Sequence, residues 1–220
     1  MAKFNYDELG KHAREIGFDG IDLTVRPKGH VLPERAAQDL PRAVETLRSR
    51  GLTVPMITTD LTKASDPAAR PTLSTAARLK VPYWKIGYYK YNLPGVEAQI
   101  AQTKTAVAGL VALSREYGMQ AGFHNHSGDH IGAAVWDIRS IIGDMDPKAI
   151  GYYFDPGHAR IEGGLYGWRI SQDIVMPRLI SSSSYAVTDA PFSKREDVAG
   201  IFAVFRIPEI RVVFPLCACP

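Results

Sequence analysis

Apolar and polar positions follow two alternating periods along the chain, which predict helices and strands in turn. Apolar residues recur at helical spacing over residues 6–16, and Asn5 and Glu8 have the spacing of a capping box. Gly17 then occupies the position where glycine commonly ends a helix. A short apolar run at 20–25, GIDLTV, follows and predicts a strand. This order of helix, glycine and strand is the unit that the rest of the chain repeats.

The same pattern recurs four more times before residue 155. Strands are predicted to begin near residues 20, 53, 83, 120 and 150, with helices at about 40–47, 66–79, 96–117 and 134–144 between them and a further helix at about 164–176. Strands that alternate with helices in this way predict successive βαβ units and a parallel sheet. An eight-stranded barrel and an open doubly wound sheet both satisfy the pattern.

Two further features favour the barrel. No glycine-rich loop of the dinucleotide or nucleotide type follows any predicted strand. Polar residues gather instead at the carboxyl ends of several strands, where barrel enzymes build their sites. We therefore predict an α/β, TIM-barrel-like fold.

Composition and charge bound the class of protein. The chain has 220 residues, 45% hydrophobic and 22% charged, with a net charge of +3 and basic residues interleaved with acidic ones. These values predict a soluble globular protein with no nucleic-acid partner. Neither a signal peptide nor a membrane-length apolar run stands out. Cys217 and Cys219 are the only cysteines, which excludes a disulfide framework and predicts a reducing, cytoplasmic setting.

Candidate chemistry begins in the stretch FHNH at 123–126, which closes an apolar run. Alternation along a strand places His124 and His126 on one face and Asn125 on the other. A neutral imidazole can bind a divalent metal, and a neighbouring one can hydrogen-bond a substrate hydroxyl. The alternative is a polar loop whose histidines hydrogen-bond the backbone.

A second strand end, FDPGH at 154–158, lies one repeat further on. The carboxylate of Asp155 could simply cap the following backbone, because Asp before Pro-Gly favours a turn. Two such ends on adjacent parallel strands could instead bring His124 and Asp155 to one cation. Mn²⁺, Mg²⁺, Co²⁺ and Zn²⁺ all suit such ligands, and the spacing does not choose among them.

Weaker candidates follow other predicted strands. Arg26 could bind an anionic or hydroxylated substrate, and Lys85 stands inside an apolar run, where a buried ammonium needs a partner or a lowered pKa. For all of these a structural role is the more common one. The set comprises Arg26, His30, Thr58, Thr59, Asp60, Lys85, Tyr88, Tyr89 and Tyr91.

Three stretches together, GFDGIDL, HNHSGDHIG and YYFDPGHA, resemble the xylose isomerase-like TIM-barrel superfamily, from about residue 1 to about residue 180. The resemblance implies a divalent metal held by Glu, Asp, His and Glu from the fifth to eighth strands. It also implies isomerisation or epimerisation of a sugar, in which the two glutamates move a proton at the carbon next to a metal-polarised carbonyl.

Residue by residue, the resemblance implies that Asp155 is the sixth-strand metal ligand and that His158 contacts substrate. His124 occupies the place of the fifth-strand Glu. A histidine there can still bind the metal, but one of the two glutamate bases is lost. His126 is then a substrate contact, and Arg26 and Asn125 are further candidates for substrate binding.

The two ends of the chain depart from the family pattern. GIDLTV corresponds to the second strand, so the first is missing, and the pattern ends near residue 180. We predict a partial barrel over residues 1–180 and a tail outside the family over 181–220. Such a barrel would expose sheet edges unless IFAVF or IRVVF pairs there or another subunit covers them, which predicts low solubility or a homo-oligomer.

The sequence therefore predicts a divalent-metal-dependent isomerase or epimerase of a sugar, sugar phosphate or keto-sugar acid. The alternative is a non-catalytic or decayed homologue that binds a sugar or metal without turnover. A phosphodiester-cleaving relative is disfavoured because its many His and Glu ligands and its basic groove are not found.

Overall fold

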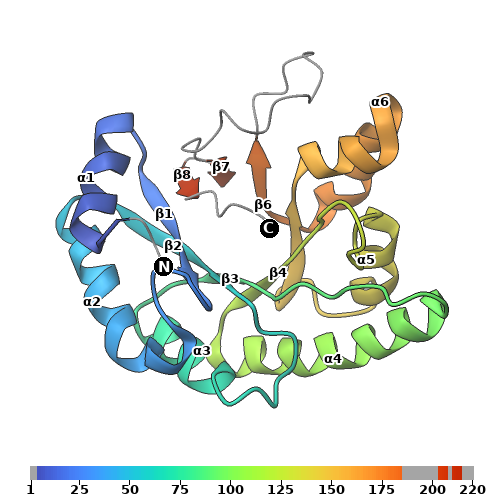
Figure 1. Cartoon of the computed structure of the whole chain (residues 1–220), viewed down its shortest axis with the longest axis horizontal. Coiled ribbons are helices and arrows are strands. Elements are labelled where there is room, and N and C mark those ends of the chain that lie inside the picture. The colour runs from blue at the N-terminus through green and yellow to red at the C-terminus, as the bar shows by residue number, and fades with distance from the viewer. Residues whose placement is uncertain (1–3, 185–202, 208–209, 215–220) are drawn as a thin grey trace.

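The computed structural model describes residues 4–184, 203–207 and 210–214, and shows a curved sheet with helices along its outer side (Figure 1). Helices and strands alternate as the sequence predicts. The strands are β1 (Gly20–Val25), β2 (Thr53–Thr59), β3 (Tyr83–Lys85), β4 (Gln120–His124), β5 (Ile150–Phe154), β6 (Leu179–Ser184), β7 (Ala203–Ile207) and β8 (Ile210–Phe214). The helices are α1 (Tyr6–Ile16), α2 (Ala36–Ser49), α3 (Ala69–Arg78), α4 (Val96–Tyr117), α5 (Val135–Ile142) and α6 (Pro156–Val175), with short 3₁₀ turns at Pro33–Arg35 and Met176–Arg178.

Within the described residues, the strands from β1 to β6 pair in parallel and in chain order. This confirms the predicted α/β barrel. The barrel is incomplete because the repeat of parallel strand and helix ends at β6 and does not reach eight units. The ring is closed differently: β7 pairs antiparallel with β6 and with β8, and β8 pairs parallel with β1. The two apolar runs near the C-terminus therefore do pair with the sheet edges, one of the alternatives that the sequence left open.

Local chemistry sets the element ends. The capping box of α1 is present, since Asn5 accepts from the Glu8 N–H and Glu8 from the Asn5 N–H, and Gly17 is left-handed at φ +90°. Helix α6 begins at Pro156, eight residues before the predicted start, because Asp155 caps it and proline suits a first helical position. Gly164, at φ +62°, kinks this helix.

The sheet separates an apolar outer layer from an interior that carries several polar side chains. On β1, Ile21, Leu23 and Val25 belong to the core shared with the helices, whereas Asp22 and Thr24 alternate with them. The register continues this inward row across the sheet, because Thr24 pairs with Thr58, Thr58 with Lys85, and Lys85 with Gly122, two residues before His124. The barrel therefore carries buried polar side chains where many barrels carry branched apolar ones.

Some expectations concern other parts of the chain. Cys217 and Cys219 lie outside the described residues. The predicted boundary at residues 180–181 falls inside β6. Among the helices of the described residues, none combines the length and apolar character needed to span a membrane.

Candidate active site

The ends of β4 and β5 bring His124 and Asp155 together. His124 is the last residue of β4 and pairs with Tyr153, and Asp155 follows two residues later on the same face. The Nε2 atom of His124 lies 3.9 Å from Oδ2 of Asp155. The two residues are 7% and 1% exposed, so the pair is held away from bulk water.

The two oxygens of the Asp155 carboxylate have different neighbours. Oδ1 accepts the backbone N–H of His158 at 2.9 Å and so caps α6. Oδ2 lies 3.9 Å from His124 Nε2 and 4.0 Å from His158 Nε2. The capping role and the proposed site role are therefore compatible, because each uses a different oxygen.

Asn125 joins the two strand ends. Its amide nitrogen donates to the Asp155 carbonyl at 2.9 Å, and the Asp155 N–H donates to its amide oxygen at 2.7 Å. Asn125 is 1% exposed. Because a side-chain amide offers a donor and an acceptor in a fixed plane, it matches a peptide group in both directions. This geometry favours a positioning role for Asn125 over direct contact with substrate.

Four histidines gather around the Asp155 carboxylate: His124, His126, His130 and His158. They are called here the histidine cluster. The ring centroids of His126 and His158 are 4.0 Å apart, and those of His126 and His130 are 4.3 Å apart. Ser127 organises the cluster, since its hydroxyl lies 2.9 Å from His158 Nδ1 and its carbonyl 2.9 Å from His126 Nδ1. A carbonyl can only accept, so Nδ1 of neutral His126 carries the proton and Nε2 the lone pair.

Tyr88 completes one side of the cluster. Its hydroxyl lies 3.2 Å from His124 Nδ1, and its ring contacts the rings of His126 and His130. The ammonium of Lys85, 3% exposed, lies 3.6 Å from the Tyr88 ring centroid and donates to the Ile86 carbonyl at 2.8 Å. Tyr88 was a weak candidate in the sequence, where aromatic residues of the core give the same signal.

Burial sets the protonation of the cluster. It lowers the pKa of His124 well below the usual value, and the positive charges of Lys85 and His158 lower this pKa further. Burial also lowers the pKa of His126 to about 4. Both imidazoles are therefore neutral near pH 7, the form that binds a metal or accepts a proton.

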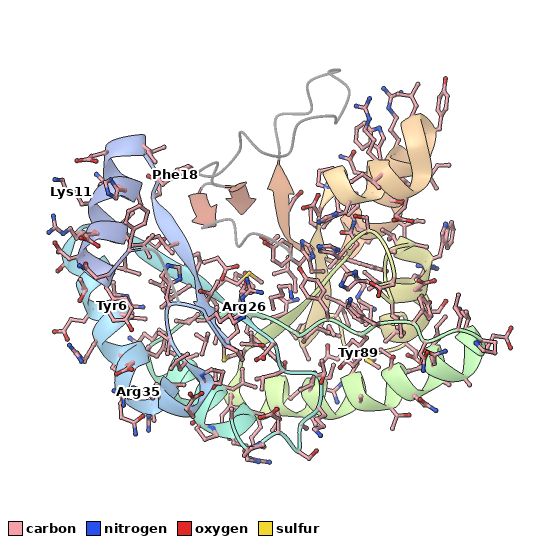
Figure 2. All side chains as sticks on the ribbon, viewed as in Figure 1. Tyr6, Lys11, Phe18, Arg26, Arg35 and Tyr89 are labelled. Atoms are coloured by element: carbon pink, nitrogen blue, oxygen red, sulfur yellow. The ribbon has the colours of Figure 1, made fainter. Side chains whose placement is uncertain are left out.

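The β1 side of the barrel supplies a second polar group. Figure 2 shows Arg26 on the side of β1 that faces away from α1 and α2. The buried carboxylate of Asp22 accepts the Thr58 hydroxyl at 2.6 Å. Sequence reasoning did not select Asp22, although a carboxylate inside the apolar run GIDLTV is a usable signal. Other candidates on this side of the barrel have partners within the protein. The Thr59 hydroxyl donates to the Lys85 carbonyl and the Tyr89 hydroxyl to the Thr62 carbonyl. Nδ1 of His30 lies 2.7 Å from Thr24 Oγ1.

The residues present fit a divalent cation in part. Two ligand atoms 3.9 Å apart can both reach one ion, because bonds of about 2.0–2.2 Å span that distance at a wide angle. Among the residues that the structure describes, no group of three or more His, Cys, Asp or Glu side chains is arranged to hold a metal.

A cavity of about 420 Å³ lies away from this site, at the opposite ends of β3 to β5, and is lined by residues such as Tyr83, Gln120 and Ala149.

The family follows from the sequence match. The model of the family described as "Xylose isomerase-like TIM barrel" matches residues 11–187. The chain therefore belongs to this family, as its motifs and its fold both indicate. Among curated proteins, none matches the chain.

Solved structures show the same fold at low sequence identity. The apo 3-keto-D-glucoside 4-epimerase YcjR from E. coli is 15% identical with a TM-score of 0.63, over 81% of this chain and 74% of its own. The D-allulose 3-epimerase from Methylomonas sp., in complex with D-allulose, is 16% identical with a TM-score of 0.61, over 79% and 64%. A xylose isomerase-like TIM barrel protein from Mycobacterium smegmatis, in complex with magnesium, is 18% identical with a TM-score of 0.62, over 79% and 63%. The chain thus spans about two thirds of the length of such relatives.

Proposed function

We propose that this chain binds a sugar at the carboxyl ends of β4 and β5 and acts as a sugar isomerase or epimerase. The observation that carries the proposal is the convergence of His124 and Asp155 from adjacent strands, with His126 and His158 beside them. Family membership supports the reaction class, and the epimerases among the structural relatives support a sugar as the substrate class.

His124 Nε2 and Asp155 Oδ2 are the atoms that we assign to a divalent metal. An imidazole and a carboxylate suit Mn²⁺, Mg²⁺, Co²⁺ or Zn²⁺. When bound, such an ion would polarise the sugar carbonyl and so raise the acidity of the neighbouring carbon. Because only two protein ligands are assigned, the ion would keep several of its waters, and its affinity for the chain should be modest.

His126 and His158 are the groups that we assign to the substrate. Neutral His126 offers Nε2 as an acceptor, because its Nδ1 donates to the Ser127 carbonyl. This atom can accept a hydrogen bond from a substrate hydroxyl. Asn125 is assigned a positioning role, since its amide holds the backbone of Asp155.

Exchange of a carbon-bound hydrogen tests the proposal. D-Fructose and D-allulose are incubated in D₂O with the chain and Mg²⁺ or Mn²⁺, and deuterium at the carbons beside the carbonyl is followed by NMR. We expect exchange that Asp155→Asn lowers at least tenfold, because one ligand charge is lost. Asp144→Asn, the same change at an exposed ion pair with Lys104, should leave exchange unchanged. Equal rates for Asp155→Asn and the parent chain would refute the site.

A second candidate is sugar binding without turnover. It is favoured by the observation that the described residues offer no three-donor metal group. Saturation-transfer NMR separates the two functions, because this second function predicts contact between ketose and chain without any deuterium incorporation.

We also propose a cytoplasmic protein with a small carbohydrate substrate and no nucleic-acid or membrane partner. The interleaving of basic and acidic residues along the chain supports the absence of a nucleic-acid partner, and the cysteine usage supports a cytoplasmic setting. The pairing of β7 and β8 with the sheet edges removes the sequence-based reason for a homo-oligomer, so sedimentation velocity should show a monomer.

A further inference from the structure

Ser127, in the loop after β4, contacts three of the four rings of the histidine cluster, and the proposed function gives it no role. Its hydroxyl oxygen lies 2.9 Å from Nδ1 of His158, which comes from the first turn of α6. Its carbonyl oxygen lies 2.9 Å from Nδ1 of His126 and 3.1 Å from Nδ1 of His130. Two groups of one residue therefore contact rings from two different segments of the chain.

The carbonyl contacts set the tautomers of two rings. A carbonyl oxygen accepts hydrogen bonds and cannot donate them, so Nδ1 of neutral His126 and of neutral His130 carries the proton. The Nε2 atom of each ring then holds a lone pair and can accept. Because any residue at position 127 has a backbone carbonyl, these two tautomers do not depend on the serine side chain.

The hydroxyl contact needs a second observation, because a hydroxyl can donate to Nδ1 of His158 or accept from it. The other ring nitrogen supplies this observation: Nε2 of His158 lies 4.0 Å from Oδ2 of Asp155, a residue that is 1% exposed. A carboxylate attracts an N–H and repels a lone pair, and burial weakens the screening by solvent. Neutral His158 therefore carries its proton on Nε2, and its Nδ1 accepts from the Ser127 hydroxyl.

We infer that Ser127 is a positioning residue that makes His158 a hydrogen-bond donor, and His126 and His130 acceptors, at Nε2. The inference rests on the proposed function for its ligand, a ketose, and adds which ring donates to the sugar and which rings accept from it. The carbonyl oxygen of a ketose can only accept, so it suits the Nε2–H of His158. A sugar hydroxyl can donate to the lone pairs of the other two rings. Ser127 thus acts on the sugar only through these rings.

Nitrogen NMR of the imidazole rings tests the tautomers in the metal-free chain, in mildly alkaline buffer, where a histidine of ordinary pKa is neutral. In the parent chain we expect a proton on Nδ1 of His126 and His130 and on Nε2 of His158. In Ser127→Ala the Nδ1 signal of His158 should move, because this atom loses its donor, whereas the signals of the other two rings should stay. Ser127→Thr keeps a hydroxyl and should restore the parent signal.

Binding of D-fructose, measured by NMR titration, gives the second readout. Ser127→Ala should weaken it about threefold to tenfold, the usual effect of losing one hydrogen bond, and Ser127→Thr should bind as the parent chain does. Ser140→Ala serves as the matched control, because it removes an exposed helix hydroxyl that also bonds within the protein. It should change neither the fructose affinity nor the His158 signal.

A proton on Nδ1 of His158 in the parent chain, or a His158 signal that Ser127→Ala does not move, would overturn the positioning role. Equal fructose affinity in Ser127→Ala and the parent chain would overturn the link to the sugar. Failure of the parent chain to bind fructose would count against the proposed function instead. The nitrogen signals would still decide the role of Ser127 in that case, because they are recorded without sugar.

Discussion

His124 Nε2 and Asp155 Oδ2 face each other across 3.9 Å from the ends of adjacent parallel strands. The distance is too long for a hydrogen bond, whose donor and acceptor lie within about 3.2 Å. It is short enough for both atoms to touch one ion. The pair is therefore the feature to test first.

Metal affinity should depend on Asp155. Asp155→Asn keeps an oxygen that can cap α6 but removes the charge that faces His124. We expect Mn²⁺ affinity, read from the free-ion signal in electron paramagnetic resonance, to fall at least tenfold with the melting temperature nearly unchanged. Asp144→Asn serves as the surface control, and equal Mn²⁺ affinity in both variants would argue against the site.

Asn125 should matter for stability. Asn125→Leu leaves the backbone N–H and C=O of Asp155 without their present partners, so we expect a loss of about 2–5 kcal/mol in the free energy of unfolding. Urea denaturation measures it. Gln99→Ala removes an exposed amide that also bonds backbone groups and should cost under about 1 kcal/mol. A similar loss in both variants would contradict the positioning role.

Tyr88→Phe should affect the site without affecting the fold. The change deletes the hydroxyl that lies 3.2 Å from His124 Nδ1 and keeps the ring. Groups that orient a metal-binding imidazole commonly contribute about 10–100-fold in metal affinity, so a loss near the lower bound is expected for Mn²⁺. Tyr166→Phe, on an exposed part of α6, provides the control. Unchanged Mn²⁺ affinity in Tyr88→Phe would show that the hydroxyl does not orient His124.

His30 should make the folded state sensitive to acid. Burial, aided by Arg26, lowers its pKa from 6.5 to about 4. Between these values the unfolded chain binds a proton that the folded chain does not, so stability is lost as pH falls. The loss is on the order of 2 kcal/mol. Asp22, with a raised pKa, acts in the opposite direction between its ordinary value of 3.8 and about 7.

Comparison of urea midpoints at pH 7 and 4.5 isolates this effect. His30→Gln should show a smaller decrease in stability than the parent chain, whereas His12→Gln, on the exposed side of α1, should match the parent. An unchanged pH dependence in His30→Gln would mean that His30 titrates alike in the folded and unfolded chains.

Several elements were predictable because their signals are local. The capping box at Asn5 and Glu8 and the apolar stripe after it fix α1 without any distant contact.

The end of β3 was not predictable in this way. The strand ends at Lys85, although the apolar run continues to residue 89. The reason is tertiary: the Gly87 N–H bonds the Leu61 carbonyl, and a Cβ at Gly87 would lie 2.3 Å from the Asp60 carbonyl oxygen.

By itself, the sequence determined the alternation of strands and helices, the inward face of His124, and the place of Asp155 after the next strand. These follow from side-chain periodicity and from residues within one repeat of each other. Only the tertiary structure decided which Asp155 oxygen faces the histidines, that Asn125 holds the Asp155 backbone, and that Asp22 and Arg26 carry unsatisfied polar atoms. Those relations depend on strand register and on burial, which arise when segments about 30 or more residues apart pack together.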